Sequence, residues 1–246
     1  MELDILCVEA YINLIKNKNI VITGTSSGIG LKLAKIFLKN NNNVWGCSRK
    51  NQKIFHKNYF HSKVDLVNIF PTKRWISRVQ KQSKNKIDIL INNAVKFNRN
   101  LNSLEKFDSI DRSVKINLIS PMILSNIISK LMMMNKGGAI IFFSSVATEI
   151  KQIGSSTYSS TKSGLEVFSE IISKELKQFD IKVATLRILY SPTKLSNQLN
   201  KVEIKNLLKK YKTNKYRNVK DIFIEISKIF EEKKFLKKNI FFDKKK

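Results

Sequence analysis

A chain of 246 residues with 42% hydrophobic side chains can bury a large core, and this length is common for a single α/β domain. The formal net charge of +27 raises nucleic acid or an anionic membrane surface as partners. However, the lysines are spread through the chain, and the densest basic clusters, at 209–212 and 244–246, are short. We therefore expect solvated surface charge rather than a specific nucleic-acid site.

Residues 1–18 form an N-terminal extension ahead of one domain that we expect to run from 19 to 246. The apolar residues of the extension favour a helix that packs on the domain or on a partner subunit. Its acidic residues argue against a basic targeting peptide. The two cysteines, Cys7 and Cys47, form no paired motif, and the sequence offers no convincing metal set. We expect a reducing, cytoplasmic location.

A glycine-rich turn follows the first predicted strand, at 20–23. The turn reads Gly-Thr-Ser-Ser-Gly-Ile-Gly from Gly24 to Gly30, and a helix with one apolar face follows over 29–39. Strand, turn and helix in this order bring backbone N–H groups and the positive end of a helix to a pyrophosphate. By itself, such a loop is equally consistent with a tight turn that binds nothing.

Apolar strands and helices alternate along the rest of the chain. This alternation predicts a mostly parallel, doubly wound sheet (a Rossmann fold) in a single three-layer α/β/α domain. The further strands are expected at 44–47, 88–91, 139–143, 182–188 and 240–242, and the further helices at 71–83, 109–134 and 157–178. The stretch after 117 is apolar, but polar residues interrupt it, so we expect a buried or subunit-facing helix and no membrane span.

The surrounding sequence distinguishes Tyr158 and Lys162 from the other tyrosine and lysine pairs of the chain. Tyr-x-x-x-Lys occurs five times in this lysine-rich chain, so the pair alone carries little information. Only Tyr158 follows, after a loop, an apolar strand-like run that ends in a serine, Ser145. The expected strand end and helix would bring these three side chains together.

The chemistry of a serine, a tyrosine and a lysine explains why they belong in one site. Residues four apart on a helix share a face, so the Lys162 ammonium can lie near the Tyr158 hydroxyl. At about 4 Å and an effective dielectric near 20, it would favour the phenolate by roughly 4 kcal/mol, which brings the tyrosine pKa close to neutral. Such a group can protonate a carbonyl oxygen while a hydride reaches the carbon, and Ser145 can hold the same oxygen.

With these motifs in this order, the chain resembles the short-chain dehydrogenase/reductase family over about residues 20–193, with a weaker echo to 243. The resemblance implies a catalytic set of Ser145, Tyr158, Lys162 and Asn117, with Asn117 holding a water of the proton relay. It also implies an NAD(P) site. The cofactor-binding residues that it implies are Thr23, Gly24, Ser26, Ser27, Gly28, Ile29, Gly30, Asp65, Leu66, Asn92, Ala94, Tyr158, Lys162 and Thr193.

Arg49 bears on the choice of cofactor, because it follows the second predicted strand where the adenosine ribose should lie. No acidic residue occupies positions 46–50. An acidic side chain there would accept from the ribose 2′-hydroxyl, whereas arginine pairs with a 2′-phosphate, so NADP is favoured over NAD. The alternative is that Arg49 is one more surface cation in a basic protein.

Two positions depart from the family pattern at the nicotinamide end of the pocket. Val95 stands where the family usually has glycine, and Ile188-Leu189 stand where a Pro-Gly pair normally turns the chain. Glycine permits close approaches that bulkier side chains resist. A catalytically impaired nucleotide-binding scaffold or regulatory protein is therefore the alternative to an enzyme.

The expected function is an NADP-dependent oxidoreductase that reduces a carbonyl or oxidises the corresponding alcohol. The resemblance also implies a homodimer or homotetramer built through the helices near 109–134 and 157–178. A variable substrate lid is expected at about 194–217, where the sequence is polar and basic. This composition favours a polar, anionic or carrier-bound substrate over a long apolar one.

Overall fold

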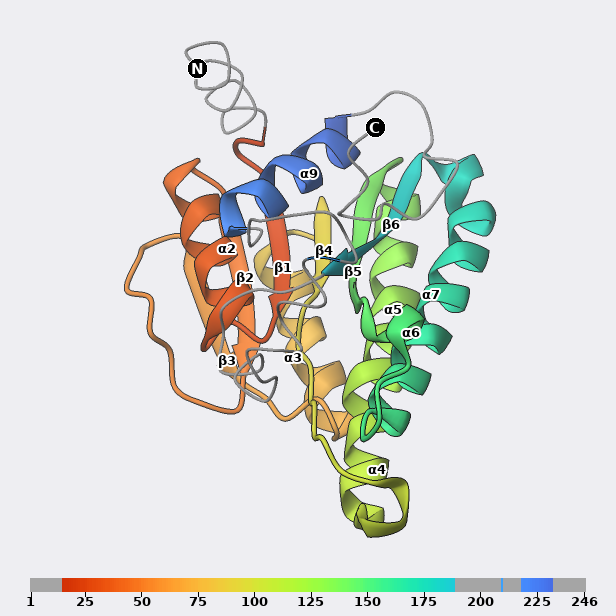
Figure 1. The fold of residues 1–246 in the computed structure, drawn as a ribbon. Helices are drawn as coiled ribbons and strands as arrows, with labels where there is room; N and C mark the ends of the chain where they lie inside the picture. Colours follow the sequence, from red (N-terminus) through yellow and green to blue (C-terminus); the bar gives the residue numbers. More distant parts are fainter. Residues whose placement is uncertain (1–14, 189–208, 210–217, 232–246) are drawn as a thin grey trace.

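The computed structural model describes residues 15–188, 209 and 218–231, drawn in colour in Figure 1. In these residues one six-stranded sheet has the order β3-β2-β1-β4-β5-β6, and every neighbouring pair is parallel. The strands are β1 (Asn19–Thr23), β2 (Asn43–Ser48), β3 (Tyr59–Lys63), β4 (Ile89–Asn92), β5 (Gly138–Ser145) and β6 (Ile181–Ile188). The order reverses between β1 and β4, the place where open α/β sheets bind ligands.

Helices cover both faces of the sheet (Figure 1). The helices α2 (Gly28–Lys39) and α9 (Val219–Glu231) pack on one face. On the other face lie α3 (Ile69–Gln82), α5 (Ser120–Met134) and α7 (Ser156–Leu176). Shorter elements are η1 (Asn102–Leu104), α4 (Phe107–Val114), the π-helical turn η2 (Lys115–Ile119), α6 (Ala147–Ile150) and η3 (Lys177–Phe179).

Successive side chains of each central strand belong alternately to two separate hydrophobic cores, one on each face of the sheet. Ile20 and Ile22 of β1 are buried against α2 and α9, whereas Val21 between them is buried on the α3 and α5 side. Successive side chains of a strand point to opposite faces, so a strand covered on both sides is apolar throughout. The doubly wound parallel sheet and the three layers that the sequence predicts are confirmed.

Several boundaries differ from the sequence prediction. The edge strand β3 and the helix α9 were not predicted, and the helix expected over 109–134 is divided into α4, η2 and α5. Residues 1–14, the strand expected at 240–242 and all of the expected lid except Lys209 lie outside the described residues. Ile15 of the N-terminal extension is fully buried in the core beside α2 and α9.

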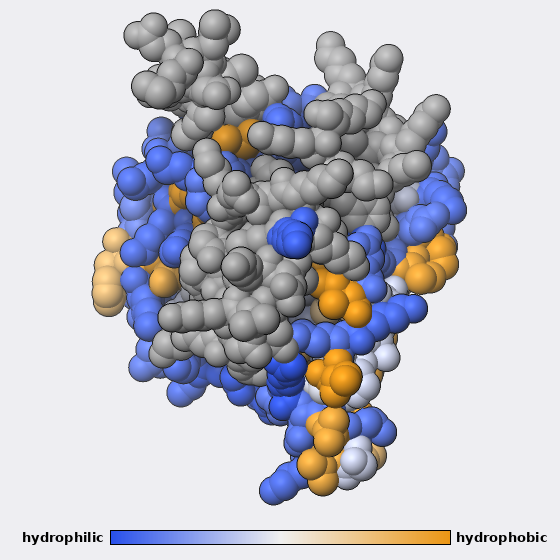
Figure 2. Space-filling view, viewed as in Figure 1, coloured by the Kyte–Doolittle hydropathy of each residue, from blue (hydrophilic) through white to orange (hydrophobic). Residues whose placement is uncertain are grey.

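The run of helical residues Phe107–Met134 is long and apolar enough to cross a membrane, with a mean hydropathy of 1.4 in its most apolar window. However, 56% of that window is buried inside the protein, as in a core helix. The part of the surface that Figure 2 colours by hydropathy is mainly hydrophilic, with apolar side chains gathered near α4. The exposed apolar residues of that region include Leu101, Leu104 and Phe107.

Phe223 tests whether α9 is an integral part of the core. Its side chain is fully buried, and its ring meets that of Phe37 in α2 edge to face at 5.0 Å. We expect Phe223→Ala to lower the free energy of unfolding by about 3–5 kcal/mol, because the truncation leaves a cavity between two helices. Urea unfolding followed by circular dichroism measures the loss. Phe107→Ala removes a side chain that is 80% exposed and should leave the midpoint unchanged.

Candidate active site

The glycine-rich turn between β1 and α2 adopts a backbone that side chains resist. Gly24 has a φ of +77° and Gly28 a φ of +60°. The N-cap residue of α2, Ser27, forms no side-chain cap, so the first N–H groups of the helix keep their donors for an anion. Strand, turn and helix therefore have the geometry that the sequence predicts for a pyrophosphate site.

Asn93 joins this turn to the end of β4. Its Nδ2 donates to the backbone oxygens of Thr23 at 2.7 Å and Gly24 at 3.2 Å. In return, Thr23 Oγ1 accepts from the backbone N–H groups of Asn93 at 3.0 Å and Ala94 at 2.9 Å. A Cβ on Gly30 would overlap Asn93 Nδ2 and lie 2.5 Å from Gly24 O. Asn93 was not predicted as a site residue, and it is the group that holds the turn.

Charged residues gather beyond β2 and β3, where the adenosine is expected. The carboxylate of Asp65, a predicted adenine contact, is paired with Arg112 of α4. Burial lowers the pKa of the Lys96 ammonium, and repulsion from Arg112 and Arg49 lowers it further, while Glu105 opposes the shift. Arg49, Lys96 and Arg112 are therefore close enough for their charges to interact, and the last two were not predicted from the sequence.

The side chain and backbone of the predicted adenine contact Leu66 have different surroundings. Its side chain is buried in the core beside α3, and its backbone oxygen accepts from Ser120 Oγ at 2.6 Å. The side chain and the backbone oxygen of Leu66 are therefore both occupied by contacts within the protein. At the neighbouring strand end, Asn92 Nδ2 donates to Ser125 Oγ at 3.4 Å.

Ser145, Tyr158 and Lys162 are brought together, as the sequence predicts. Ser145 ends β5, and its side chain lies close enough to the Tyr158 hydroxyl on α7 to lower the pKa of that hydroxyl. Lys162 lies one turn beyond the tyrosine, with its Nζ 5.9 Å from the centre of the Tyr158 ring. Phe97, which was not predicted, meets the Tyr158 ring edge to face at 4.7 Å.

Asn117 lies in the π-helical turn η2 and is fully buried. Its amide exchanges two hydrogen bonds of 2.8 Å with the backbone of Lys96, and its Nδ2 also approaches Thr161 Oγ1 at 3.2 Å. The side chain thus joins the segment after β4 to α7. A π-turn widens a helix and is frequent at functional sites, and no sequence pattern indicated this one.

Burial dominates the ionisation of the two central groups. It lowers the pKa of Lys162 to about 8, opposed by the negative charge of Glu166, and Lys162 Nζ donates to Phe143 O at 2.6 Å. Burial also raises the pKa of Tyr158 to about 12, opposed by the hydrogen bond with Ser145. The near-neutral tyrosine predicted from the sequence is therefore wrong for this structure. The ammonium donates to a carbonyl oxygen and lies over the ring of Tyr158, and burial of the phenol is the largest influence on its pKa.

The unusual residues of the nicotinamide end are only partly described. Val95 is half-buried, and Ile188 packs against the core beside α2 and α9. The backbone oxygen of Ile188 accepts from Val146 N at 3.4 Å, next to Ser145. Leu189 and the predicted cofactor contact Thr193 lie outside the described residues.

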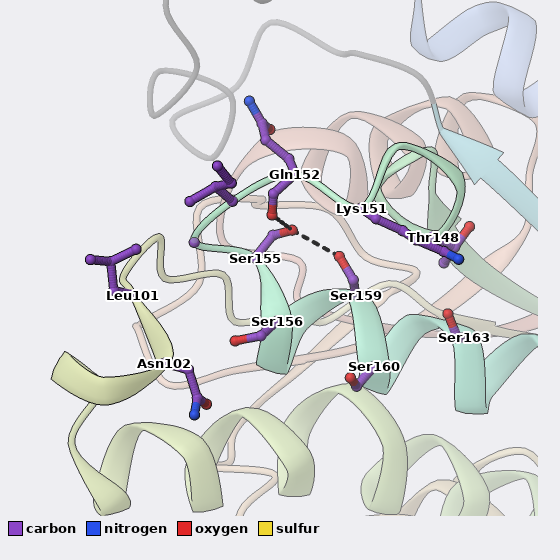
Figure 3. A pocket seen from close by; sticks show the side chains of 12 residues that line it. Leu101, Asn102, Thr148, Lys151, Gln152, Ser155, Ser156, Ser159, Ser160 and Ser163 are labelled. Carbon is purple, nitrogen blue, oxygen red and sulfur yellow. Dashed lines mark hydrogen bonds between the residues drawn. The ribbon is translucent and has the colours of Figure 1, made fainter.

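A hollow of about 490 Å³ lies on the side of α7 away from the catalytic side chains. Figure 3 shows hydroxyl groups of Ser155, Ser156, Ser159 and Ser160 along one helix face, opposite the segment of Leu101. Ser155 Oγ donates to Gln152 O at 2.6 Å and lies 2.9 Å from Ser159 Oγ. Neither Tyr158 nor Lys162 lines this hollow.

The family model of the short chain dehydrogenases matches residues 18–204. The chain therefore belongs to the short-chain dehydrogenase/reductase family and is an oxidoreductase that acts between an alcohol and a carbonyl group.

Relatives and solved structures agree with this assignment. The chain is 30% identical over 210 residues to a 3-oxoacyl-[acyl-carrier-protein] reductase FabG of Buchnera aphidicola subsp. Baizongia pistaciae, with coverage of 82% of this chain and 85% of that protein. It is 28% identical to the Chlamydia pneumoniae FabG, covering 74% of this chain and 77% of that protein. The fold matches a 4-hydroxyisoleucine dehydrogenase complexed with NADH at a TM-score of 0.83, with 22% identity and coverage of 92% and 97%.

Gly30→Ala tests whether the contact of Asn93 with the glycine-rich turn holds that turn against the end of β4. Because its methyl group would overlap Asn93 and crowd Gly24 O, we expect the free energy of unfolding to fall by about 1–3 kcal/mol. We also expect dinucleotide affinity, measured by fluorescence titration, to weaken by about tenfold or more.

The matched control is Gly164→Ala in α7, where a Cβ would meet Leu118 at an ordinary 3.5 Å. This variant should keep its dinucleotide affinity and be as stable as the parent or up to about 1 kcal/mol more stable. Equal stability and equal dinucleotide affinity of the two variants would refute the role of the Asn93 contact in holding the turn.

Proposed function

We propose that the protein is an NADP-dependent reductase in which Ser145, Tyr158 and Lys162 carry hydride transfer to a carbonyl. The observation that carries the proposal is the placement of Ser145 beside the buried Tyr158, with the buried Lys162 side chain on the next turn of the same helix. Ser145 lies at the carboxyl end of β5, and Tyr158 and Lys162 lie in the first turns of α7. All three are on the same edge of the sheet as the glycine-rich turn.

Each residue has a distinct role in this proposal. Tyr158 donates its hydroxyl proton to the carbonyl oxygen, and Ser145 holds that oxygen as negative charge develops. Lys162 supplies the positive charge beneath the tyrosine, and Asn117 fixes the backbone on which a relay water would rest. When bound, the dinucleotide supplies the hydride, with its pyrophosphate held by the turn from Gly24 to Gly30.

The ionisation of Tyr158 favours reduction. With a pKa raised to about 12, the hydroxyl is protonated near neutral pH. The protonated form is the one that donates to a carbonyl oxygen, whereas alcohol oxidation needs the phenolate. We therefore propose carbonyl reduction as the favoured direction.

The choice of NADP rests on the cations around the ribose position. Lys96 is repelled by both Arg112 and Arg49, with Asp65 and Glu105 as the neighbouring carboxylates. A ribose 2′-phosphate would add an anion among them and accept charge-assisted hydrogen bonds from arginine. Four of the similar solved structures carry NADH, so their ligands support a dinucleotide without a preference for the phosphate.

We propose an anionic or carrier-bound acyl substrate, because several relatives are 3-oxoacyl-[acyl-carrier-protein] reductases and the segment 194–217 is basic. We also propose a cytoplasmic homodimer or homotetramer. Val167 and Ile171, one turn apart on α7, are 60% and 50% exposed and would be covered in such an assembly. Residues 19–246 would form the whole catalytic domain, preceded by the extension 1–18.

The alternative remains a scaffold that binds the dinucleotide without turnover. Val95 and Ile188 favour it, since each is bulkier than the family's usual residue at its position. Tight NADPH binding by a protein that reduces none of a panel of 3-oxoacyl thioesters, keto-sugars and small ketones would support the scaffold.

Tyr158→Phe removes the proton donor and keeps the ring that packs on Phe97. We expect kcat for carbonyl reduction to fall by about 10²-fold or more, while NADPH affinity is retained. The control is Tyr59→Phe, whose hydroxyl bonds Thr25 at 2.8 Å near the cofactor turn. It can alter the KM for NADPH but should leave kcat close to that of the parent. A fully active Tyr158→Phe protein would rule out the mechanism.

Arg49→Asp tests the cofactor preference. The parent protein should bind NADPH about tenfold or more tightly than NADH, because a charge-assisted pair with the 2′-phosphate is absent from NADH. The variant should reverse this order. Arg78→Asp makes the same charge change at an exposed position of α3 and should keep the parent's preference. Equal affinities of the parent for the two dinucleotides would refute the role of Arg49.

A further inference from the structure

A buried ion pair lies directly behind the catalytic residues. Glu166 follows Lys162 by one turn of α7, and Arg187 is the penultimate residue of β6. Their side chains are only 14% and 10% exposed. Arg187 Nη2 donates to Glu166 Oε2 at 2.6 Å and Arg187 Nε donates to Glu166 Oε1 at 3.0 Å, which makes the contact two-pronged.

The pair connects the elements that carry Ser145, Tyr158 and Lys162 with α6 and β6. Glu166 Oε1 also accepts from Ser144 Oγ at 2.5 Å and from Thr148 Oγ1 at 3.3 Å. Arg187 donates in addition to Glu149 of α6. Ser144 pairs with Arg187 in the β5–β6 register and is the residue before Ser145. One carboxylate thus ties the end of β5, the start of α6 and α7 to β6.

The charge of Glu166 also reaches the catalytic lysine. It is the group that opposes the effect of burial on the pKa of Lys162. The titratable and charged groups facing this part of the site are Tyr158 and Glu166 from α7, Arg187 from β6 and Glu149 from α6. A buried carboxylate that is held by an arginine on one side attracts an ammonium on its other side less strongly than a lone carboxylate does.

We propose that Glu166 and Arg187 are positioning residues. Their ion pair holds the Ser145 strand end against α7, and the opposite charges of the two partners together set the charge on Lys162. The inference rests on the proposed role of Lys162. It predicts that the two partners have opposite electrostatic effects. Neutralising Glu166 removes an anion near Lys162, whereas neutralising Arg187 leaves Glu166 free to stabilise the ammonium.

The experiment compares Glu166→Gln and Arg187→Met by the pH dependence of kcat and of NADPH affinity. Loss of the Lys162 proton should end both activity and tight NADPH binding as pH rises. We expect this alkaline limit to move to lower pH in Glu166→Gln and to higher pH in Arg187→Met, each by about 0.5–1 pH unit. A purely structural role would move neither limit, or both in one direction.

The matched control is Glu170→Gln, which removes a carboxylate four residues further along the same helix. Glu170 is exposed and bonded to Lys174 at 3.3 Å, so its alkaline limit should equal that of the parent. Arg187→Lys retains a cation but loses the two-pronged contact. It should lower kcat and leave the alkaline limit in place. If Arg187→Met does not fold, the shift in Glu166→Gln against its control carries the electrostatic test.

A third readout needs neither turnover nor dinucleotide. The pKa of Lys162 is lowered from 10.5 to about 8 in the folded protein, so the unfolded chain binds more protons between these values and stability rises with pH there. In Glu166→Gln this rise should begin at lower pH, as followed by the melting temperature from pH 6 to 10. A parent without reductase activity would overturn the proposed function alone. Unshifted pH limits and an unshifted melting curve in Glu166→Gln would overturn the ion-pair inference.

Discussion

The hydrogen bonds between the ends of β1 and β4 are the constraint on which the rest of the site depends. Thr23 and Asn93 bond across the point where the strand order reverses, each through side chain and backbone. The contact uses up the space beside Gly24 and Gly30, so the turn is kept tight and α2 begins close to the sheet. The proposed phosphate site is thus prepared by a contact that itself needs no ligand.

The charged groups at and behind the proposed catalytic site are buried rather than exposed. Among the described residues most lysines lie on the surface, where water screens them, but Lys162 is 3% exposed and Arg187 is 9% exposed. Buried ions need partners, and these two obtain theirs from a backbone oxygen and from two glutamates. The strongly basic composition of the chain therefore says little about the chemistry of its site.

The sequence predicted the fold well because apolar strands buried on both faces leave an unmistakable pattern, as in β1 and β5. It did not predict the edge strand β3, whose sequence, Tyr-Phe-His-Ser-Lys, is half polar. Helix α9 could have been found, since its buried residues follow helical spacing, with Ile222, Phe223 and Ile226 on one face.

The site was predicted where it depends on local spacing and missed where it depends on contacts between distant segments. Tyr158 and Lys162 are four residues apart, and Glu166 follows at the same interval, so helical spacing could have included it. Arg187 could not be found in this way, because its link to Glu166 depends on the register of β5 and β6. The ionisation of Tyr158 was mistaken since a charge partner can be read from a sequence but depth of burial cannot.

The π-turn at Lys115–Ile119 also has an evolutionary consequence. Such a turn is equivalent to one residue inserted into an α-helix, and each residue rotates a helix by about 100°. Loss of a single residue here would restore a regular helix and turn α4 away from its present heading, separating Arg112 from Asp65. We therefore expect a deletion of one residue in this segment to be more disruptive than a substitution, because it would displace Arg112 of α4 relative to Asn117.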